Sequence, residues 1–193
     1  AGRGPNVLIS AQTNQPVDYA LRGAAEPITQ FADYEEVLAP YSPSSYRQFI
    51  FEDNIYAVPE TQTFCMMFYR TDILDEFGLE PPETWDELYA MLPILQRNNL
   101  DVGATGIFGA MLYQAGGSYY NEELTATQLT TKLSVDVFTK YTDLFTQYSL
   151  PVNYDLFNRF RTGEMPIGFT TYTFYNQLKQ AAPEISGLWE MTL

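Results

Sequence analysis

Strand-like apolar segments alternate with helical segments along this 193-residue chain. Short strands are predicted where apolar, β-branched and aromatic residues cluster between turns, at residues 5–10, 62–69, 101–106, 165–169 and 187–193. Helices are predicted between them, at residues 16–22, 33–39, 43–51, 71–77, 85–95, 107–115, 135–148, 155–162 and 173–181. This alternation is typical of the α/β class, in which helices pack on a sheet.

Two of the predicted helices have clear local signals. Thr84 and Glu87 have the spacing of a capping box, in which the hydroxyl and the carboxylate each accept a hydrogen bond from a free backbone N–H. Pro93 removes a backbone donor from the same helix and is expected to kink it. The apolar face of this helix is expected to be Trp85, Leu88, Met91, Leu92 and Leu95, and that of the later helix Val135, Phe138, Tyr141, Phe145 and Tyr148.

Charge and residue usage exclude several classes of function. The sequence has 24 acidic and ten basic residues, a formal charge of −14, which disfavours nucleic acids and anionic membranes as partners. Because there is no histidine, neither a Ser-His-Asp site nor a usual Cys/His zinc site is possible within the chain. The single cysteine, Cys65, is expected to be buried and inert. We expect no catalytic residue, metal or cofactor.

Aromatic residues instead favour binding. Fifteen Tyr, 13 Phe and two Trp make up 16% of the chain, and many of these rings must belong to the core. A tyrosine also offers an apolar ring face and a polar tip, which suit the C–H faces and the hydroxyl rim of a sugar. This composition by itself is compatible with sugar binding and does not require it.

Five segments occur in the order found in one known protein family: Gly4–Val7, Tyr56–Gln62, Phe68–Leu74, Pro82–Leu88 and Phe160–Gly168. Through them the chain resembles the extracellular solute-binding proteins of family 1, whose fold is periplasmic-binding-protein-like type II, as in maltodextrin-binding proteins. Within the first segment, this chain has Asn6 at a position where the family usually has Asp. The resemblance covers nearly the whole chain.

The resemblance implies two α/β lobes joined by hinge strands, with a solute held in the cleft between them. Residues 1–58 would form a partial N-terminal lobe, and residues 59–193 a C-terminal lobe with hinge-proximal strands at its start and end, so that the chain is an internal fragment. The implied function is to deliver a sugar or oligosaccharide to the ABC permease subunits of an importer. The implied location is extracellular, as a cell-surface lipoprotein or a periplasmic protein, with an export signal upstream.

Four polar residues are candidate ligand contacts under this resemblance. In such folds ligands meet the loops at the carboxyl ends of strands. Ser10 and Gln12 follow the first predicted strand, and their alternative role is that of a polar turn. Glu60 and Gln62 stand beside the crossover between lobes, where a carboxylate or amide can bind vicinal hydroxyls. Their alternative role is hinge-strand surface.

Three aromatic residues complete the candidate site. Tyr172 and Tyr175 follow the strand at 165–169, at a position where the family stacks an aromatic ring on sugar. Phe108 lies in a loop-to-helix region that the family uses for ligand, with core packing as its alternative. We expect Tyr172 and Gln62 to line one concave wall.

An enzyme and a non-catalytic interaction domain remain alternative interpretations. A glycoside hydrolase needs two carboxylates across a scissile bond, and four candidates are Asp53, Glu60, Asp155 and Glu164. Nothing in their spacing selects a pair. Arg161 and Glu164 are expected to form an exposed ion pair at a helix end.

Overall fold

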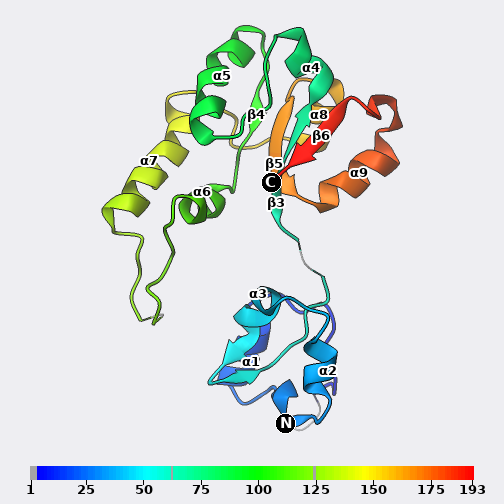
Figure 1. The fold of residues 1–193 in the computed structure, drawn as a ribbon, viewed down its shortest axis with the longest axis vertical. Helices are drawn as coiled ribbons and strands as arrows, with labels where there is room; N and C mark the ends of the chain where they lie inside the picture. The colour runs from blue at the N-terminus through cyan, green and yellow to red at the C-terminus, as the bar shows by residue number, and fades with distance from the viewer. Residues whose placement is uncertain (1–3, 62, 124) are drawn as a thin grey trace. The chain divides into compact units, whose positions relative to one another are not determined.

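A computed structural model describes residues 4–61, 63–123 and 125–193 of the chain (Figure 1). The chain divides into two compact units, residues 1–62 and 63–193. The division falls after residue 62, whereas the sequence analysis places a lobe boundary after residue 58. Among the described residues, no helix has the length and apolar character needed to cross a bilayer.

The larger unit is built around a four-stranded mixed sheet with the strand order β4-β5-β3-β6. β3 pairs antiparallel with both β5 and β6, and β4 runs parallel to β5. The first and last strands of the unit are therefore neighbours, although the rest of the unit lies between them in sequence. The strands are β3 (Cys65–Arg70), β4 (Val102–Gly103), β5 (Ile167–Thr171) and β6 (Trp189–Thr192).

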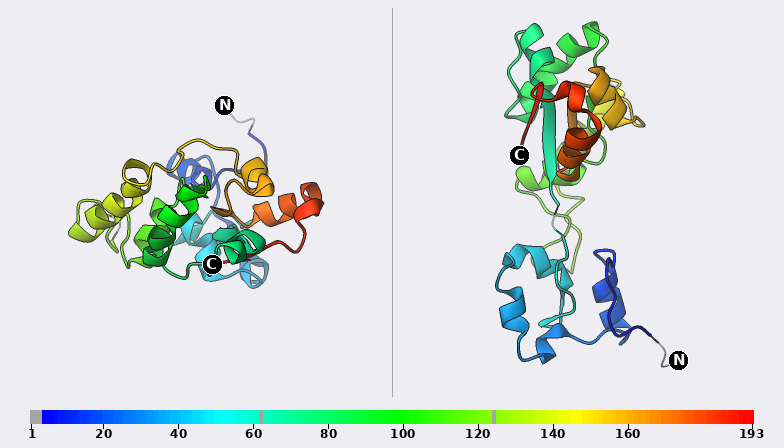
Figure 2. Two further views of the ribbon diagram at one scale, coloured as in Figure 1. Left: turned by 90° about the horizontal axis from the view of Figure 1, so that it is seen from above. Right: turned by 90° about the vertical axis from the view of Figure 1, so that its right-hand side faces the viewer.

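Helices cover both faces of this sheet, which confirms the predicted α/β class (Figures 1 and 2). The helices on one face are α5 (Trp85–Arg97), α6 (Phe108–Gln114) and α7 (Lys132–Thr146). Those on the other face are α8 (Leu156–Thr162), α9 (Thr173–Ala181) and the short η3 (Pro183–Ile185). The remaining helix, α4 (Thr71–Glu76), follows β3 directly.

Strand β3 supplies side chains to both cores, because successive side chains of a strand point to opposite faces. Met67 and Tyr69 belong to the core under α5, α6 and α7, whereas Met66 and Phe68 belong to the core under α8 and α9. Phe68 is fully buried and packs edge-on against Phe174, with ring centroids 5.0 Å apart. Burial on both faces explains why the sequence of β3 is almost continuously apolar.

The start of α5 and the end of α8 have clear local causes. At the start of α5, the backbone N–H of Glu87 donates to Thr84 Oγ1 (3.2 Å) and that of Thr84 donates to Glu87 Oε2 (3.0 Å), which confirms the capping box. The helix continues through Pro93 to Arg97. Gly163 ends α8 at φ +87°, a left-handed conformation that glycine adopts without steric cost.

The predicted apolar face of α7 is partly wrong. Val135 and Phe138 are about half exposed, whereas Ser134, Val137 and Leu144 are buried. The buried residues of α7 thus lie on a face next to the predicted one, and this face includes the polar residue Ser134. Its hydroxyl donates to the backbone carbonyl of Gln128 (2.8 Å), and a buried polar group is tolerated when it is hydrogen-bonded.

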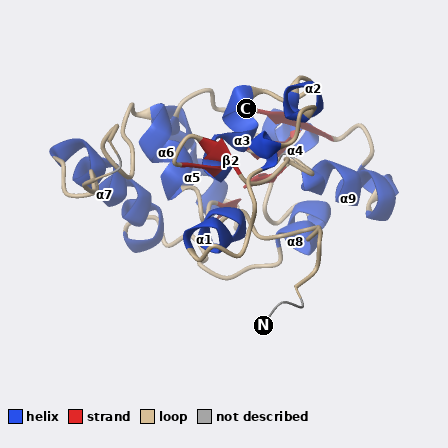
Figure 3. Cartoon of the chain, turned by 90° about the horizontal axis from the view of Figure 1, so that it is seen from below, coloured by secondary structure: helices blue, strands red, loops and turns tan. Residues whose placement is uncertain are grey.

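The smaller unit consists of short helices, one short hairpin and loops (Figure 3). Its helices are α1 (Gln15–Leu21), η1 (Ile28–Gln30), α2 (Tyr34–Leu38), α3 (Pro43–Tyr46) and η2 (Arg47–Phe49). The hairpin pairs β1 (Ile50–Phe51) with β2 (Asn54–Ile55). The helix predicted at 43–51 therefore ends early, because residues 50 and 51 pair with this neighbouring strand.

The strand predicted at residues 5–10 is wrong. Residues 5–10 form no strand, and Val7 and Ile9 are 75% and 72% exposed. A strand needs a partner for its backbone N–H and C=O groups, and no strand in the described part of the chain pairs with this segment. Without a sheet to join, its apolar side chains do not enter a core.

A buried cation joins the end of β3 to the end of α8. Arg70 is only 6% exposed, and its Nε and Nη2 donate to the carboxylate of Asp72 (2.8 and 2.7 Å). Its Nη1 donates to the backbone carbonyls of Phe160 (3.0 Å) and Arg161 (3.3 Å), at a helix end where carbonyls lack helical partners. Hydrogen bonding to Arg70 lowers the pKa of Asp72 below its ordinary value of 3.8.

We predict that Arg70→Met lowers the free energy of unfolding by about 3 kcal/mol, because it leaves a carboxylate and two carbonyls without their donor. Arg97→Met, at an exposed position of α5, is the control and should change it by less than about 0.5 kcal/mol. Urea unfolding monitored by circular dichroism measures both. The deficit of Arg70→Met should be full above pH 3.8 and shrink as the pH falls through the lowered pKa of Asp72. A deficit that stays constant in acid would contradict the ion pair as its source.

Candidate functional site

The candidate site lies at the end of the larger unit's sheet where β5 and β6 finish and β3 begins. The strand register pairs Cys65 with Thr171 and Met67 with Thr192, so these three strand ends lie side by side. β4 runs parallel to β5 and finishes toward the same end. In α/β folds, ligands commonly bind beyond the carboxyl ends of strands.

Four aromatic side chains form a continuous row that begins at this end of the sheet. We call Phe64, Tyr172, Tyr175 and Trp189 the aromatic row. Tyr172 stacks parallel to Tyr175, with ring centroids 5.6 Å apart and an interplanar angle of 4°. Phe64 lies 5.8 Å from Tyr172 on a tilted plane, and Trp189 lies 5.7 Å from Tyr175 edge-on.

Local backbone structure fixes the row. Tyr172 is the residue at which β5 gives way to α9, so Tyr175 follows it by nearly one helical turn on the same side. The backbone N–H of Tyr172 donates to the carbonyl of Phe64 (3.2 Å), which joins the entry of β3 to the exit of β5.

The two ends of the row differ in exposure. Phe64 and Tyr172 are 48% and 37% exposed, whereas Tyr175 and Trp189 are partly buried and pack on the core under α8 and α9. The Lys179 ammonium lies 5.9 Å from the centroid of the Tyr175 ring, in the position of a cation–π contact. The exposed end therefore offers aromatic surface on a rigid support, and both tyrosines carry hydroxyl groups that can hydrogen-bond.

The structure brings two polar candidates of the smaller unit together. The backbone N–H and the hydroxyl of Ser10 both donate to Glu60 Oε2, at 3.2 and 3.3 Å. Ser10 has a φ of +58°, which is uncommon for a residue with a side chain. The backbone N–H of Gln12 donates to Gln15 Oε1 (2.8 Å), and the backbone N–H of Gln15 donates to the Gln12 carbonyl (2.9 Å), so Gln12 lies in the turn that leads into α1.

Two further candidates have different outcomes. Gln62 lies outside the described residues, so the wall expected from Tyr172 and Gln62 stays a prediction. Phe108 is partly buried, and its ring packs against Tyr119, Phe138 and Tyr141 with centroids 5.5–6.1 Å apart. These contacts favour the core-packing alternative for Phe108.

Two of the carboxylates considered for a hydrolase, Asp155 and Glu164, have structural partners. Asp155 caps α8 by accepting a hydrogen bond from the backbone N–H of Asn158 (3.1 Å). Glu164 pairs with Arg159 (3.3 Å), while Arg161 pairs with Glu184. The predicted Arg161–Glu164 pair is therefore wrong, because η3 presents Glu184 to Arg161. Within residues 4–61, 63–123 and 125–193, no three acidic or cysteine side chains are grouped closely enough to hold a metal ion.

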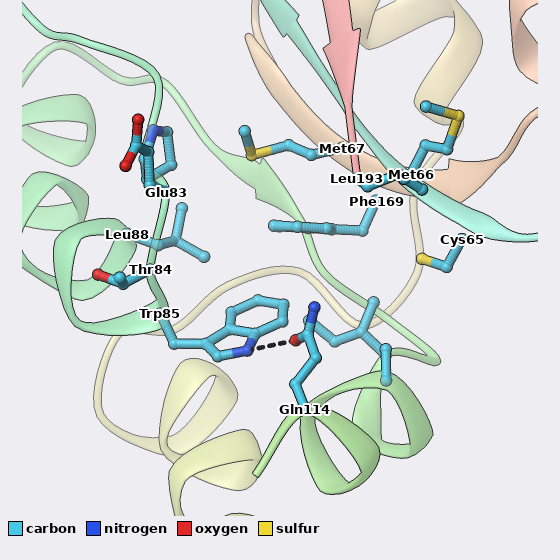
Figure 4. A pocket seen from close by; sticks show the side chains of 13 residues that line it. Cys65, Met66, Met67, Glu83, Thr84, Trp85, Leu88, Gln114, Phe169 and Leu193 are labelled. Carbon is cyan, nitrogen blue, oxygen red and sulfur yellow. Dashed lines mark hydrogen bonds between the residues drawn. The ribbon is translucent and has the colours of Figure 1, made fainter. Parts of the chain in front are cut away.

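A pocket opens on the other face of the same sheet end, under α5 and α6 (Figure 4). Cys65 lines it, and its side chain is exposed, so the predicted burial is wrong. The reason is its position, since Cys65 is the first residue of β3 and the helices do not cover that end of the strand. Partial desolvation nevertheless raises the pKa of its thiol, which keeps it protonated at neutral pH.

Several residues of the aromatic row and of the pocket were not predicted from the sequence. Phe64 and Trp189 belong to the row, and Trp85, Gln114 and Phe169 line the pocket. Alternation along β3 could have placed Phe64 on the same face as Met66 and so beside Tyr172. No sequence signal joins Trp85 to Gln114, because their contact depends on how α5 and α6 pack.

Solved structures of other proteins have a similar fold. An ABC transporter solute-binding protein from Thermotoga lettingae, bound with α-D-tagatose, matches with a TM-score of 0.78 and 23% identity. Maltose-bound MalE3 of T. maritima matches at 0.75 and 24%, and UgpB from Mycobacterium tuberculosis in complex with glycerophosphocholine at 0.73 and 19%. The matches cover 94%, 93% and 93% of this chain and 51%, 50% and 47% of those chains. The chain thus spans about half their length, and the similarity confirms the predicted periplasmic-binding-protein-like fold.

A family model built on sequences matches residues 1–187, and its description is "Bacterial extracellular solute-binding protein". The match includes all five segments on which the resemblance rested. It therefore confirms the predicted family. The chain belongs to the bacterial extracellular solute-binding protein family.

Proposed function

We propose that the intact protein captures a sugar or oligosaccharide outside the cytoplasm and delivers it to the permease of an ABC importer. Its role is binding and not catalysis. The aromatic row carries this proposal. Phe64 and Tyr172 offer exposed ring surface at the carboxyl end of β5, and an exposed ring can stack on the C–H face of a sugar.

The polar pair in the smaller unit supports the same proposal. Both hydrogen bonds from Ser10 end on Oε2 of Glu60, and no described residue donates to Oε1. A carboxylate oxygen that is free in this way can accept hydrogen bonds from sugar hydroxyls, and these are stronger than bonds between neutral groups. Glu60 and Ser10 are therefore proposed as ligand contacts, with Gln12 and Gln62 beside them in sequence.

The solutes named for the similar structures support a hydroxylated ligand. Tagatose and maltose are sugars, and glycerophosphocholine carries a glycerol moiety. We propose a sugar because the row offers two stacking rings, Phe64 and Tyr172, at its exposed end. Residues 1–62 and 63–193 are proposed as parts of the two lobes that close on the solute, in a surface-anchored or periplasmic protein.

One test of the proposed function concerns Tyr172. Titration calorimetry of the full-length protein with tagatose, maltose, longer maltodextrins and glycerophosphocholine should give saturable heat with at least one sugar. Tyr172→Ala should weaken that binding about tenfold, because it removes one stacking ring. Tyr120→Ala, an exposed tyrosine outside the row, should leave the affinity within about twofold.

Equal melting temperatures of the two variants would establish that both are folded. Absence of heat with every sugar in the panel would overturn the proposed function. Equal affinities of Tyr172→Ala and wild type would overturn the role of the row alone.

Another test of the proposed function concerns Glu60. Glu60→Ala should weaken sugar binding about tenfold, since a hydrogen bond to a charged group is lost, and Glu60→Gln should weaken it less. Glu52→Ala removes an exposed carboxylate from the same unit and should have no effect on affinity. The same calorimetric titration measures all three. A loss of affinity in Glu52→Ala as large as in Glu60→Ala would show that overall charge, and not contact, is responsible.

A further inference from the structure

The pocket under α5 and α6 is distinct from the aromatic row. It has a volume of about 270 Å³ and lies entirely within the larger unit. Met67 and Phe169 line it from the face of the sheet that α5, α6 and α7 cover, and Met66 lines it at the start of β3. None of the four residues of the aromatic row is among the residues that line it. The proposed sugar site therefore does not account for this pocket.

Apolar side chains held by the core form its walls. Leu88 and Ile107 are 1% and 2% exposed and close the pocket toward the interior. The Trp85 and Phe169 rings contact each other, with centroids 5.1 Å apart and planes inclined by 36°. Figure 4 shows the two rings beside each other at the pocket. Because these residues come from two helices and a strand of one core, the walls are preformed.

One polar group of the pocket has an unused donor. The indole N–H of Trp85 donates to Gln114 Oε1 (2.8 Å), which fixes the amide against the ring (Figure 4). No described residue accepts a hydrogen bond from Gln114 Nε2, which borders the pocket. Apolar walls with a small number of fixed polar groups are the usual composition of a site for a small molecule.

We propose that this pocket is a second binding site, for a compact, uncharged aromatic molecule that carries a hydrogen-bond acceptor. An apolar cavity of roughly 150 Å³ holds benzene, so the larger volume here accommodates a substituted ring. The ring contacts Trp85 and Phe169, and the sulfur atoms of Cys65 and Met67 lie along the same wall, where sulfur–aromatic contacts are favourable. The acceptor receives a hydrogen bond from Gln114.

Acetophenone is a probe with the required ring and carbonyl, and Trp85 is the reporter. We expect acetophenone to quench the emission of the full-length protein saturably. Trp85→Phe should abolish the saturable part and leave only the linear, collisional part. Linear quenching of the wild type, or saturable quenching that survives unchanged in Trp85→Phe, would overturn the proposal. Filling of the pocket by another part of the full-length protein would give the linear result.

Two variants, one on α6 and one at its C-cap, test the pocket without removing its core residues. Ala110→Phe places a ring inside the pocket and should weaken acetophenone binding at least about tenfold. Ala115→Phe places the same ring on an exposed residue outside the pocket and should leave the affinity within about twofold. Equal affinities of the two variants would contradict binding in this pocket.

The role of the amide has its own test. Gln114→Glu keeps an oxygen for the Trp85 N–H and removes the free donor. It should weaken acetophenone about fivefold, the effect of one hydrogen bond, and leave the competing ligand ethylbenzene within about twofold. Equal losses for both ligands would overturn the hydrogen bond. Sugar calorimetry on Ala110→Phe separates the two sites, since weakened acetophenone binding with unchanged sugar affinity supports a pocket distinct from the sugar site. A wild-type protein that binds sugar but shows only linear quenching by acetophenone would overturn the second site and leave the proposed function standing.

Discussion

The larger unit depends on the position of β3 between β5 and β6. Because β3 is paired on both edges and covered on both faces, each of its inner side chains is committed to one of two cores. The strand ends in Arg70, which binds the carboxyl end of α8 and so ties the second helical layer to the sheet. Its other end, at Cys65, is left uncovered.

That uncovered end is where both candidate sites form. Even-numbered residues such as Phe64 face the α8 and α9 side and begin the aromatic row, whereas Met67 faces the α5 and α6 side and lines the pocket. At the end of β5, Phe169 likewise lines the pocket, whereas Tyr172 belongs to the aromatic row. A single strand pair therefore places stacking surface on one side of the sheet and an open, mainly apolar pocket on the other.

Local sequence signals predicted the structure well where the hydrogen-bond partners of a segment lie within a few residues of it. The capping box at Thr84 and the stop at Gly163 need only neighbouring backbone groups, and both are present. The strand predicted around Val7 fails because a strand requires a partner elsewhere, which local composition cannot guarantee. Of the site, Tyr172 and Tyr175 were proposed from the resemblance. Phe64 and Gln114 were missed, because their roles arise from pairing and helix packing.

The Ser10–Glu60 contact shows how the less densely packed unit can still present a defined polar group. Ser10 holds a left-handed backbone conformation, which costs on the order of 1 kcal/mol for a residue with a side chain. Two hydrogen bonds to one oxygen of Glu60 offset that cost and orient the carboxylate. The second oxygen, Oε1, is then held in one direction, and it accepts no hydrogen bond from a described residue. Under the proposed function, a sugar hydroxyl bound to this oxygen would meet a preorganised acceptor, and preorganisation reduces the entropy lost on binding.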